Sequence, residues 1–147
     1  MKEIFVKSYK ELTKKELYNI LKLRSEVFVV EQNCVYQDID SKDQKAYHVY
    51  LKIDEKIRGY TRIFKPGDYF ELSSIGRVVV SKKERKLNNG RELIIASIKA
   101  IEEIFNEREI KISAQKHLEN FYKPFGFIST GKDYLEDGIP HIAMVKN

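Results

Sequence analysis

The sequence predicts an α/β or α+β fold in which helices pack against a central sheet. Val78 to Val80 form a β-branched run between Gly76 and polar residues, as expected of a central strand. Apolar residues then recur at helical spacing from 93 to 105. Strand-like and helical segments also alternate along the rest of the chain, which favours a layered domain. With 147 residues, of which 42% are hydrophobic, the chain is expected to form a single domain over residues 1–147.

The N-terminal part predicts a strand, a helix and a loop. Ile4 to Lys7 has strand character. Thr13 and Glu16 have the spacing of a capping box, so we expect a helix to begin at Thr13. Apolar residues at helical spacing extend this helix to about Glu31, and the polar residues that follow predict a loop.

The remaining elements follow in order on either side of the central strand and its helix. Asp54 to Lys56 predicts a hairpin turn, and Pro66-Gly67 predicts a break in the chain. Strands are expected over 46–53, 57–64, 109–113, 127–130 and 139–145, and a short helix over 117–125.

A basic loop joins the central strand to the next helix and has the features of an anion site. Backbone N–H groups at a helix start are free, and the helix dipole favours negative charge there. Arg85, Lys86 and Arg91 add positive charge. The loop therefore predicts a phosphate site, although basic turns also occur as plain helix caps.

The loop resembles the Arg/Gln-x-x-Gly-x-Gly/Ala loop with which GNAT acyltransferases hold the pyrophosphate of acetyl-CoA. Here it reads Arg85-Lys86-Leu87-Asn88-Asn89-Gly90, so the second glycine is kept and Asn88 replaces the first. Asparagine enters the left-handed backbone region at some cost relative to glycine, and the loop is therefore still expected to form.

Three further segments resemble the ElaA-type subgroup of the GNAT family: Leu23 to Asp40, Ala114 to Phe127 and Tyr134 to Met144. The resemblance implies a mixed, mostly antiparallel sheet of six to seven strands with about four helices. It also implies that the central and fifth strands splay apart. The implied activity is transfer of an acetyl group from acetyl-CoA to a primary amine of a small molecule or peptide, by direct attack in a ternary complex.

In that fold the pantetheine arm of acetyl-CoA pairs with backbone groups of the central strand, as an added strand would. The resemblance therefore implies acetyl-CoA contacts from the strand and the loop. These residues are Val78, Val79, Val80, Arg85, Lys86, Leu87, Asn88, Asn89, Gly90 and Arg91. Direct attack needs no nucleophilic side chain, so Cys34 is expected to be structural.

Tyr122 matches the tyrosine that many GNAT enzymes place near the CoA sulfur. Its hydroxyl would protonate the departing thiolate. Tyr122 also falls at helical spacing with Leu118 and Phe125, so an ordinary core aromatic is the alternative.

The general base is less defined. Some GNAT enzymes carry a glutamate about where Ser74 stands, and serine cannot take that role unaided. A base acting through water is therefore expected, and Glu31 is preferred over Glu71, His48 and His141 because it ends the signature helix near the acceptor cleft. The alternative for Glu31 is a solvated carboxylate at a helix end.

Four residues are expected to bind the acceptor: Arg24, Arg77, Asp38 and His141. For both arginines the alternative is a structural ion pair with an acidic side chain, and for His141 it is a hydrogen-bonded structural histidine. Four acidic residues could form a rim that attracts a cationic amine: Asp38, Asp40, Glu136 and Asp137.

Other partners are disfavoured by composition. The formal charge of +5 comes without a polybasic run or a nucleic-acid-binding motif, so no nucleic acid partner is expected. The sequence contains no Cys/His cluster, so no metal site is expected. The sequence lacks a signal peptide or an apolar span, so a cytoplasmic protein without membrane contact is expected.

Two expectations concern assembly and activity. Dimerisation is common in the GNAT fold, and a homodimer is therefore one expectation, although no segment of the sequence identifies an interface. Asn88 and Ser74 also favour, as the alternative function, a catalytically weak acetyl-CoA-binding sensor or interaction module with the same fold.

Overall fold

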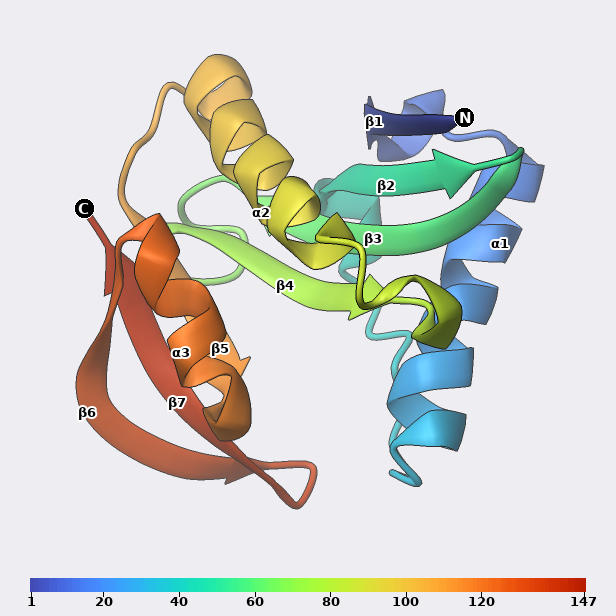
Figure 1. Cartoon of the computed structure of the whole chain (residues 1–147). Coiled ribbons are helices and arrows are strands. Elements are labelled where there is room, and N and C mark those ends of the chain that lie inside the picture. Colours follow the sequence, from blue (N-terminus) through green and yellow to red (C-terminus); the bar gives the residue numbers. More distant parts are fainter.

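The computed structural model describes residues 1–147 and contains one seven-stranded sheet covered by helices (Figure 1). The strand order is β1-β2-β3-β4-β5-β7-β6, and only the β4–β5 pair is parallel. The strands are β1 (Lys2–Ser8), β2 (Tyr47–Ile53), β3 (Lys56–Phe64), β4 (Ser73–Val80), β5 (Ile110–Gln115), β6 (Phe127–Glu136) and β7 (Ile139–Lys146). The α-helices are α1 (Lys14–Arg24), α2 (Asn89–Ala100) and α3 (Glu119–Tyr122).

The predicted first helix begins and ends where the sequence indicated. The Thr13 hydroxyl accepts a hydrogen bond from the Glu16 N–H at 3.0 Å, and the Glu16 carboxylate accepts one from the Thr13 N–H at 2.8 Å. This reciprocal capping satisfies two N–H groups that the first turn leaves free. After α1 the helix continues as a π-helical segment, Ser25–Glu31.

Two predictions about the elements need correction. The α-helices number three rather than about four, although π-helical segments extend α1 and α2 (Ser25–Glu31 and Ile101–Phe105). Strand β6 continues to Glu136 instead of ending at Thr130. Its outer half is exposed and polar at the edge of the sheet, so it lacks the apolar alternation that marks a strand in sequence.

Helices cover both faces of the sheet. Leu93, Ile94 and Ile101 from the α2 side pack with Val49 and other sheet residues in the larger buried cluster, which the aromatic residues of α3 also join. Residues of α1 and its extension pack on the opposite face in a second cluster that includes Tyr50 and Tyr60. The sheet therefore holds α2 and α3 on one side and α1 on the other.

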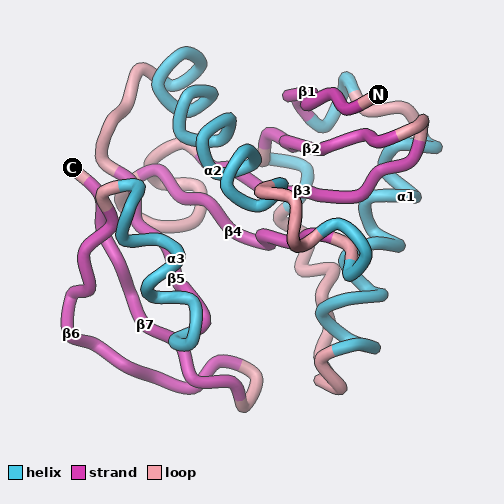
Figure 2. Tube along the Cα trace, in the orientation of Figure 1, coloured by secondary structure: helices cyan, strands magenta, loops and turns pink.

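The central strands part, as the family resemblance implied. Strands β4 and β5 pair only at Ser73 with Ile110 and at Ser74 with Lys111, and then diverge (Figure 2). A β-bulge interrupts the pairing of β3 with β4, and Arg77 in this stretch adopts a left-handed backbone with φ of 49°. Beyond Ser74, the backbone of β4 therefore has no strand neighbour on the β5 side.

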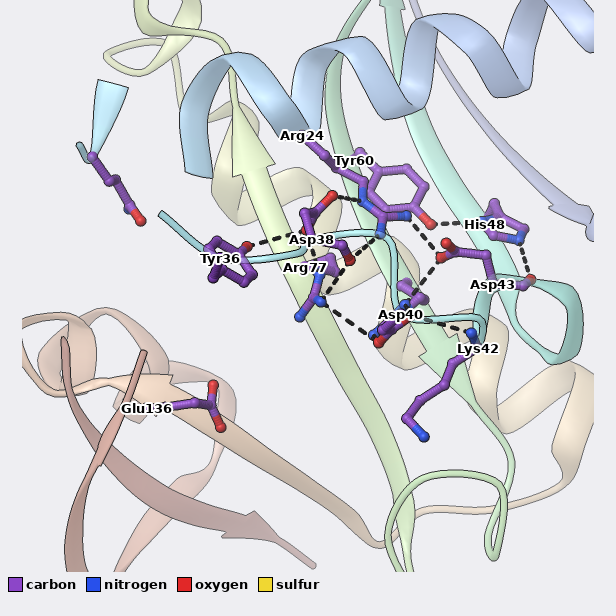
Figure 3. A network of polar contacts seen from close by, with 12 residues as sticks. Arg24, Tyr36, Asp38, Asp40, Lys42, Asp43, His48, Tyr60, Arg77 and Glu136 are labelled. Atoms are coloured by element: carbon purple, nitrogen blue, oxygen red, sulfur yellow. Dashed lines mark hydrogen bonds and ion pairs between the residues drawn. The ribbon is translucent and has the colours of Figure 1, made fainter. Parts of the chain in front are cut away.

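A network of ion pairs fastens the loop between α1 and β2 to the sheet (Figure 3). Three arginines from α1, β3 and β4 bind three aspartates of this loop. The arginines are Arg24, Arg62 and Arg77, and the aspartates are Asp38, Asp40 and Asp43. The formal charges of these six side chains balance, as required of charges held away from water.

Arg24 and Asp43 form the centre of the network. The Arg24 side chain is fully buried, and its Nη1 donates to Asp43 Oδ1 at 2.7 Å. Asp43 also accepts from Arg62 Nη1 at 3.0 Å, while Arg24 Nε donates to Asp38 at 2.9 Å. Loss of Asp43 would therefore leave two buried guanidinium groups short of a partner.

We expect Asp43→Asn to lower the free energy of unfolding by about 3–5 kcal/mol, because breaking a buried ion pair leaves uncompensated charge. Urea denaturation measures this change. The control is Asp54→Asn, since Asp54 pairs with the N-terminus in an exposed contact. Its effect should stay within about 1 kcal/mol. Equal effects of the two substitutions would contradict a stabilising role for the network.

The network also predicts a loss of stability in acid. Burial alone would raise the pKa of Asp40, but the hydrogen bond and charge of Arg62 dominate and lower it from 3.8 to about 2. Burial would likewise raise the pKa of Asp43, but the hydrogen bonds and charges of Arg24 and Arg62 outweigh it and lower this pKa. Such stabilisation is complete above the pKa of the unfolded carboxyl, about 4, and is lost as the pH falls through the folded value. Unfolding followed from pH 6 to pH 2 should show this loss, and Asp43→Asn should reduce it.

Candidate active site

A cavity of about 830 Å³ opens where β4 and β5 part. Its lining comes from β4 and the loop before α2, from β5 and α3, from the end of the first helix, and from the β6–β7 turn. Residues on the β4 side and on the β5 side of the sheet opening thus line the same cavity.

Most residues of the predicted acetyl-CoA set line this cavity. They are Val78, Val79, Val80, Arg85, Lys86, Asn88, Gly90 and Arg91. Leu87 and Asn89 do not line it. The Leu87 side chain is 60% exposed to solvent, whereas Asn89 is fully buried. The Asn89 side chain donates to the Glu84 carbonyl oxygen at 2.9 Å and accepts from Lys2 at 3.2 Å, so it shapes the loop from behind.

The loop adopts the backbone that the motif requires. Asn88 has φ of 60° and ψ of 16°, the left-handed conformation expected at the replaced glycine. A Cβ atom at Gly90 would lie 3.4 Å from the Phe121 ring and 3.8 Å from Val80. Helix α2 begins directly after Asn88, and the N–H groups of its first turn have no intrahelical acceptor. The loop therefore offers a helix N-terminus to an anion.

Arg85 of this loop is bound to Glu31. The guanidinium donates through Nη2 to Glu31 Oε1 at 2.7 Å and through Nη1 to Oε2, and its Nε donates to the Val80 carbonyl oxygen at 3.0 Å. The hydrogen bond from Arg85 is the main cause that lowers the pKa of Glu31. A carboxylate with a lowered pKa and both oxygens engaged is a poor proton acceptor. The geometry thus pairs Glu31 with the basic loop and disfavours it as the base expected from the sequence.

Tyr122 of α3 lines the same cavity and is 5% exposed. Its ring packs edge-on against Phe121 and Phe127, with centroids 5.0 and 6.0 Å away. Burial raises the pKa of Tyr122 above its ordinary value of 10.0, so the hydroxyl keeps its proton at neutral pH. Tyr122 is therefore a packed aromatic at the cavity wall that carries a protonated hydroxyl.

The four expected acceptor contacts divide into two groups. Arg77 and His141 line the cavity. Arg24 and Asp38 do not, because they are buried in the ion-pair network. Asp38 also forms an ion pair with Arg77 there, and its carbonyl oxygen accepts from Arg77 Nη2 at 2.9 Å. For Arg24 and Asp38 the structural ion pair therefore replaces the expected contact with an acceptor.

The predicted acidic rim is likewise divided. Arginines bind Asp38 and Asp40, whereas Glu136 and Asp137 line the cavity without a lysine or arginine partner. Only the β6–β7 part of the rim therefore faces an acceptor as free negative charge.

Two other candidate bases lie outside the cavity. Glu71 is exposed and is not among the lining residues. His48 is fully buried, where its Nε2 donates to the Asp43 carbonyl oxygen at 3.0 Å and its Nδ1 accepts from the Tyr60 hydroxyl at 2.6 Å. Burial lowers the pKa of His48 to about 4, so this histidine is neutral and structural.

Sequence reasoning missed an aromatic wall of the cavity. Phe64 and Tyr69 stack with ring centroids 5.2 Å apart, and Phe70 packs edge-on against Tyr69 at 4.7 Å. Tyr36 also lines the space. The adjacent aromatics Tyr69 and Phe70 in a loop after Pro66-Gly67 were a signal in the sequence, because loops at a scaffold opening often carry binding residues.

Two further observations concern the whole chain. No group of three or more His, Cys, Asp or Glu side chains is arranged to hold a metal ion. None of the helices has the length and apolar character needed to cross a membrane.

Comparisons with known proteins agree with this architecture. A model of the acetyltransferase (GNAT) domain matches residues 8–147. Protein ElaA of Escherichia coli K12 is 41% identical over 140 residues, covering 94% of this chain and 92% of ElaA. The E. coli ElaA crystal structure superposes over 100% of both chains with a TM-score of 0.93 and 39% identity. An acyl-CoA N-acyltransferase from Pseudomonas aeruginosa superposes over 99% of both chains with a TM-score of 0.91 and 37% identity. The chain therefore belongs to the GNAT acetyltransferase family.

Proposed function

We propose that this protein transfers an acetyl group from acetyl-CoA to a primary amine by direct attack in a ternary complex. One observation carries the proposal: the free edge of β4, the basic loop and the Tyr122 side chain all line one cavity. These are the parts needed to hold a CoA thioester and to protonate its leaving group.

The residues present fit acetyl-CoA. Backbone groups of β4 from Ile75 to Val80 have no strand partner on the side of the opening, so the amides of pantetheine can pair with them as an added strand would. The N-terminus of α2, together with Arg85 and Lys86, supplies N–H groups and positive charge for the pyrophosphate. In this proposal a backbone N–H near Val79 or Val80 stabilises the oxyanion of the tetrahedral intermediate.

In the proposed reaction, the amine nitrogen bonds to the thioester carbonyl carbon, and the carbon–sulfur bond breaks. The departing thiolate takes the proton of the Tyr122 hydroxyl. The nitrogen loses one of its two protons, and this proton restores the tyrosine. The products are an N-acetyl amide and CoA.

This function is tested by incubating the purified protein with acetyl-CoA and a panel of amines and measuring the release of the CoA thiol. Calorimetric titration with acetyl-CoA, CoA and desulfo-CoA measures binding separately. Amine-dependent thiol release supports the acetyltransferase. Binding without thiol release would identify the alternative, a sensor or interaction module, and turnover on hydroxyl compounds alone would contradict an amine acceptor.

A cytoplasmic location and a homodimer remain proposals from the sequence.

Tyr122→Phe should lower kcat by about 100-fold, as expected for loss of a general acid, while the Kd of acetyl-CoA stays within about twofold. The matched control is Tyr18→Phe, because Tyr18 is exposed on α1 and lies outside the cavity. Steady-state thiol release and calorimetry measure the two quantities. Unchanged kcat in Tyr122→Phe would remove this residue from the mechanism.

Glu31→Gln should tighten CoA binding by about two- to fivefold, because the carboxylate competes with the pyrophosphate for Arg85 in a partly exposed ion pair. Its kcat should change little. Calorimetry of Glu31→Gln, Arg85→Gln and the double variant separates the effects, since the gain should disappear when Arg85 is absent. A fall in kcat of about 100-fold would instead restore Glu31 as the general base.

A further inference from the structure

The part of the cavity formed by β6 and β7 carries a histidine and a glutamate that the steps above do not use. Both His141 and Glu136 line the cavity, and His141 is 7% exposed. The imidazole ring stacks on Tyr134, with centroids 6.2 Å apart and planes inclined by 19°. Figure 3 shows Glu136 apart from the arginine network, with no bond to it. This pair is thus separate from the ion pairs that fasten the loop.

Hydrogen bonding fixes which nitrogen of His141 is basic. Its Nδ1 lies 2.7 Å from the carbonyl oxygen of Ile139. A carbonyl oxygen only accepts, so Nδ1 carries the proton and donates it. In the neutral ring Nε2 therefore has a free lone pair, and this nitrogen lies 3.4 Å from Glu136 Oε2. Nε2 is therefore the ring nitrogen that can take a proton from a substrate.

Glu136 is oriented from behind by a short chain of hydrogen bonds. The Tyr134 hydroxyl donates to Ser113 Oγ at 2.6 Å, and Ser113 Oγ donates to Glu136 Oε1 at 3.3 Å. The other carboxylate oxygen of Glu136, Oε2, is the one that lies near His141. Gln115 faces His141 from β5, and Asp137 follows in the turn, so Glu136 and Asp137 are the charged groups on this side. The Glu136 side chain remains 45% exposed and can meet an incoming cation.

The charges of the cavity wall select the kind of acceptor. Arg62 and Arg77 are bound to aspartates of the loop, and Arg85 is bound to Glu31. No arginine on the acceptor side is thus left to pair with a substrate carboxylate. Glu136, by contrast, has only His141 as an ionisable partner. This part of the cavity suits an ammonium group and disfavours a neighbouring carboxylate.

The aromatic wall supplies the apolar part of the recognition. Tyr69 and Glu136 line the same cavity. The stacked rings of Phe64 and Tyr69, with Phe70 beside them, offer an apolar surface to the body of an amine. Aromatic surfaces of this kind contribute contact area at little entropic cost.

We propose that Glu136 binds the ammonium group of the acceptor, that His141 Nε2 is the general base, and that the acceptor is a primary amine with an apolar or aromatic body and no carboxylate. The inference rests on the proposed acetyl transfer. The ammonium gives one proton to His141, which passes it to solvent, and the neutral amine attacks the thioester carbon. The carbon–sulfur bond breaks, the thiolate takes the Tyr122 proton, and the second proton leaving the nitrogen restores the tyrosine.

The test compares 2-phenylethylamine with phenylalanine, which differ by the carboxylate. In the wild-type protein, kcat/KM for 2-phenylethylamine should be at least about tenfold higher, since the carboxylate has no partner.

His141→Asn keeps a donor for the Ile139 carbonyl but lacks the basic nitrogen. It should lower kcat by about 100-fold near pH 7 and remove the acidic limb of the kcat/KM profile. Glu136→Gln should mainly raise KM for the amine. Asp133→Asn on the same strand is the matched control, because Asp133 lies outside the cavity.

A binding measurement separates failure of this inference from failure of the proposed function. Calorimetry follows 2-phenylethylamine binding to the CoA-bound protein, in the wild type and in Glu136→Gln. Amine binding that is weakened in Glu136→Gln supports the site even if no thiol is released. If the wild type transfers acetyl groups and His141→Asn keeps its kcat and pH profile, the base assignment is overturned while the enzyme stands. Absence of amine binding, or a preference for phenylalanine, would overturn the acceptor site.

Discussion

The parting of β4 and β5 is the constraint on which the rest of the molecule depends. The two strands share backbone pairing only at Ser73 and Ser74, so the following six residues of β4 expose one row of peptide groups to the opening. Unpaired backbone groups away from water are costly, which makes a ligand with amides of its own the natural complement of this edge. The phosphate loop follows directly from the end of β4, and α3 closes the same space. In the proposed function, the fold would thus set the direction of a CoA thioester before any side chain contributes.

The ion-pair network converts this opening into a selective site. Arg77 lies at the bulge of β4 and reaches Asp38 and Asp40, so the loop that carries Tyr36 is fixed next to the divergent strand. The same pairing neutralises the arginines that would otherwise attract an anionic acceptor. Negative charge is left on the opposite side of the cavity, at Glu136. If the proposed acceptor site is correct, stability and acceptor preference are linked through one set of contacts.

What the sequence predicted well depends on residues that are close along the chain. Thr13 and Glu16 cap a helix three residues apart, and Asn88 adopts the left-handed backbone of a local motif. What it did not predict depends on distant partners. Glu31 and Arg85 are 54 positions apart, and their pairing removed the expected base. Arg24 is likewise buried only because aspartates 14 and 19 residues later return to it. An apolar pattern shows that a helix face is buried, but it does not show which charge is buried with a partner.

The absence of a carboxylate on β4 explains why the base would lie on β7. Ser74, where some family members carry a glutamate, is 2% exposed, and its hydroxyl has no hydrogen-bond partner in the protein. It lines the cavity at the point where the strands separate, opposite the wall that contains His141. An amine attacking a thioester held along β4 has its nitrogen between these two walls. Its proton can leave toward either of them, provided that one carries a basic atom within reach. In the proposed reaction, a base on β7 in place of one on β4 would therefore change which strand receives the proton.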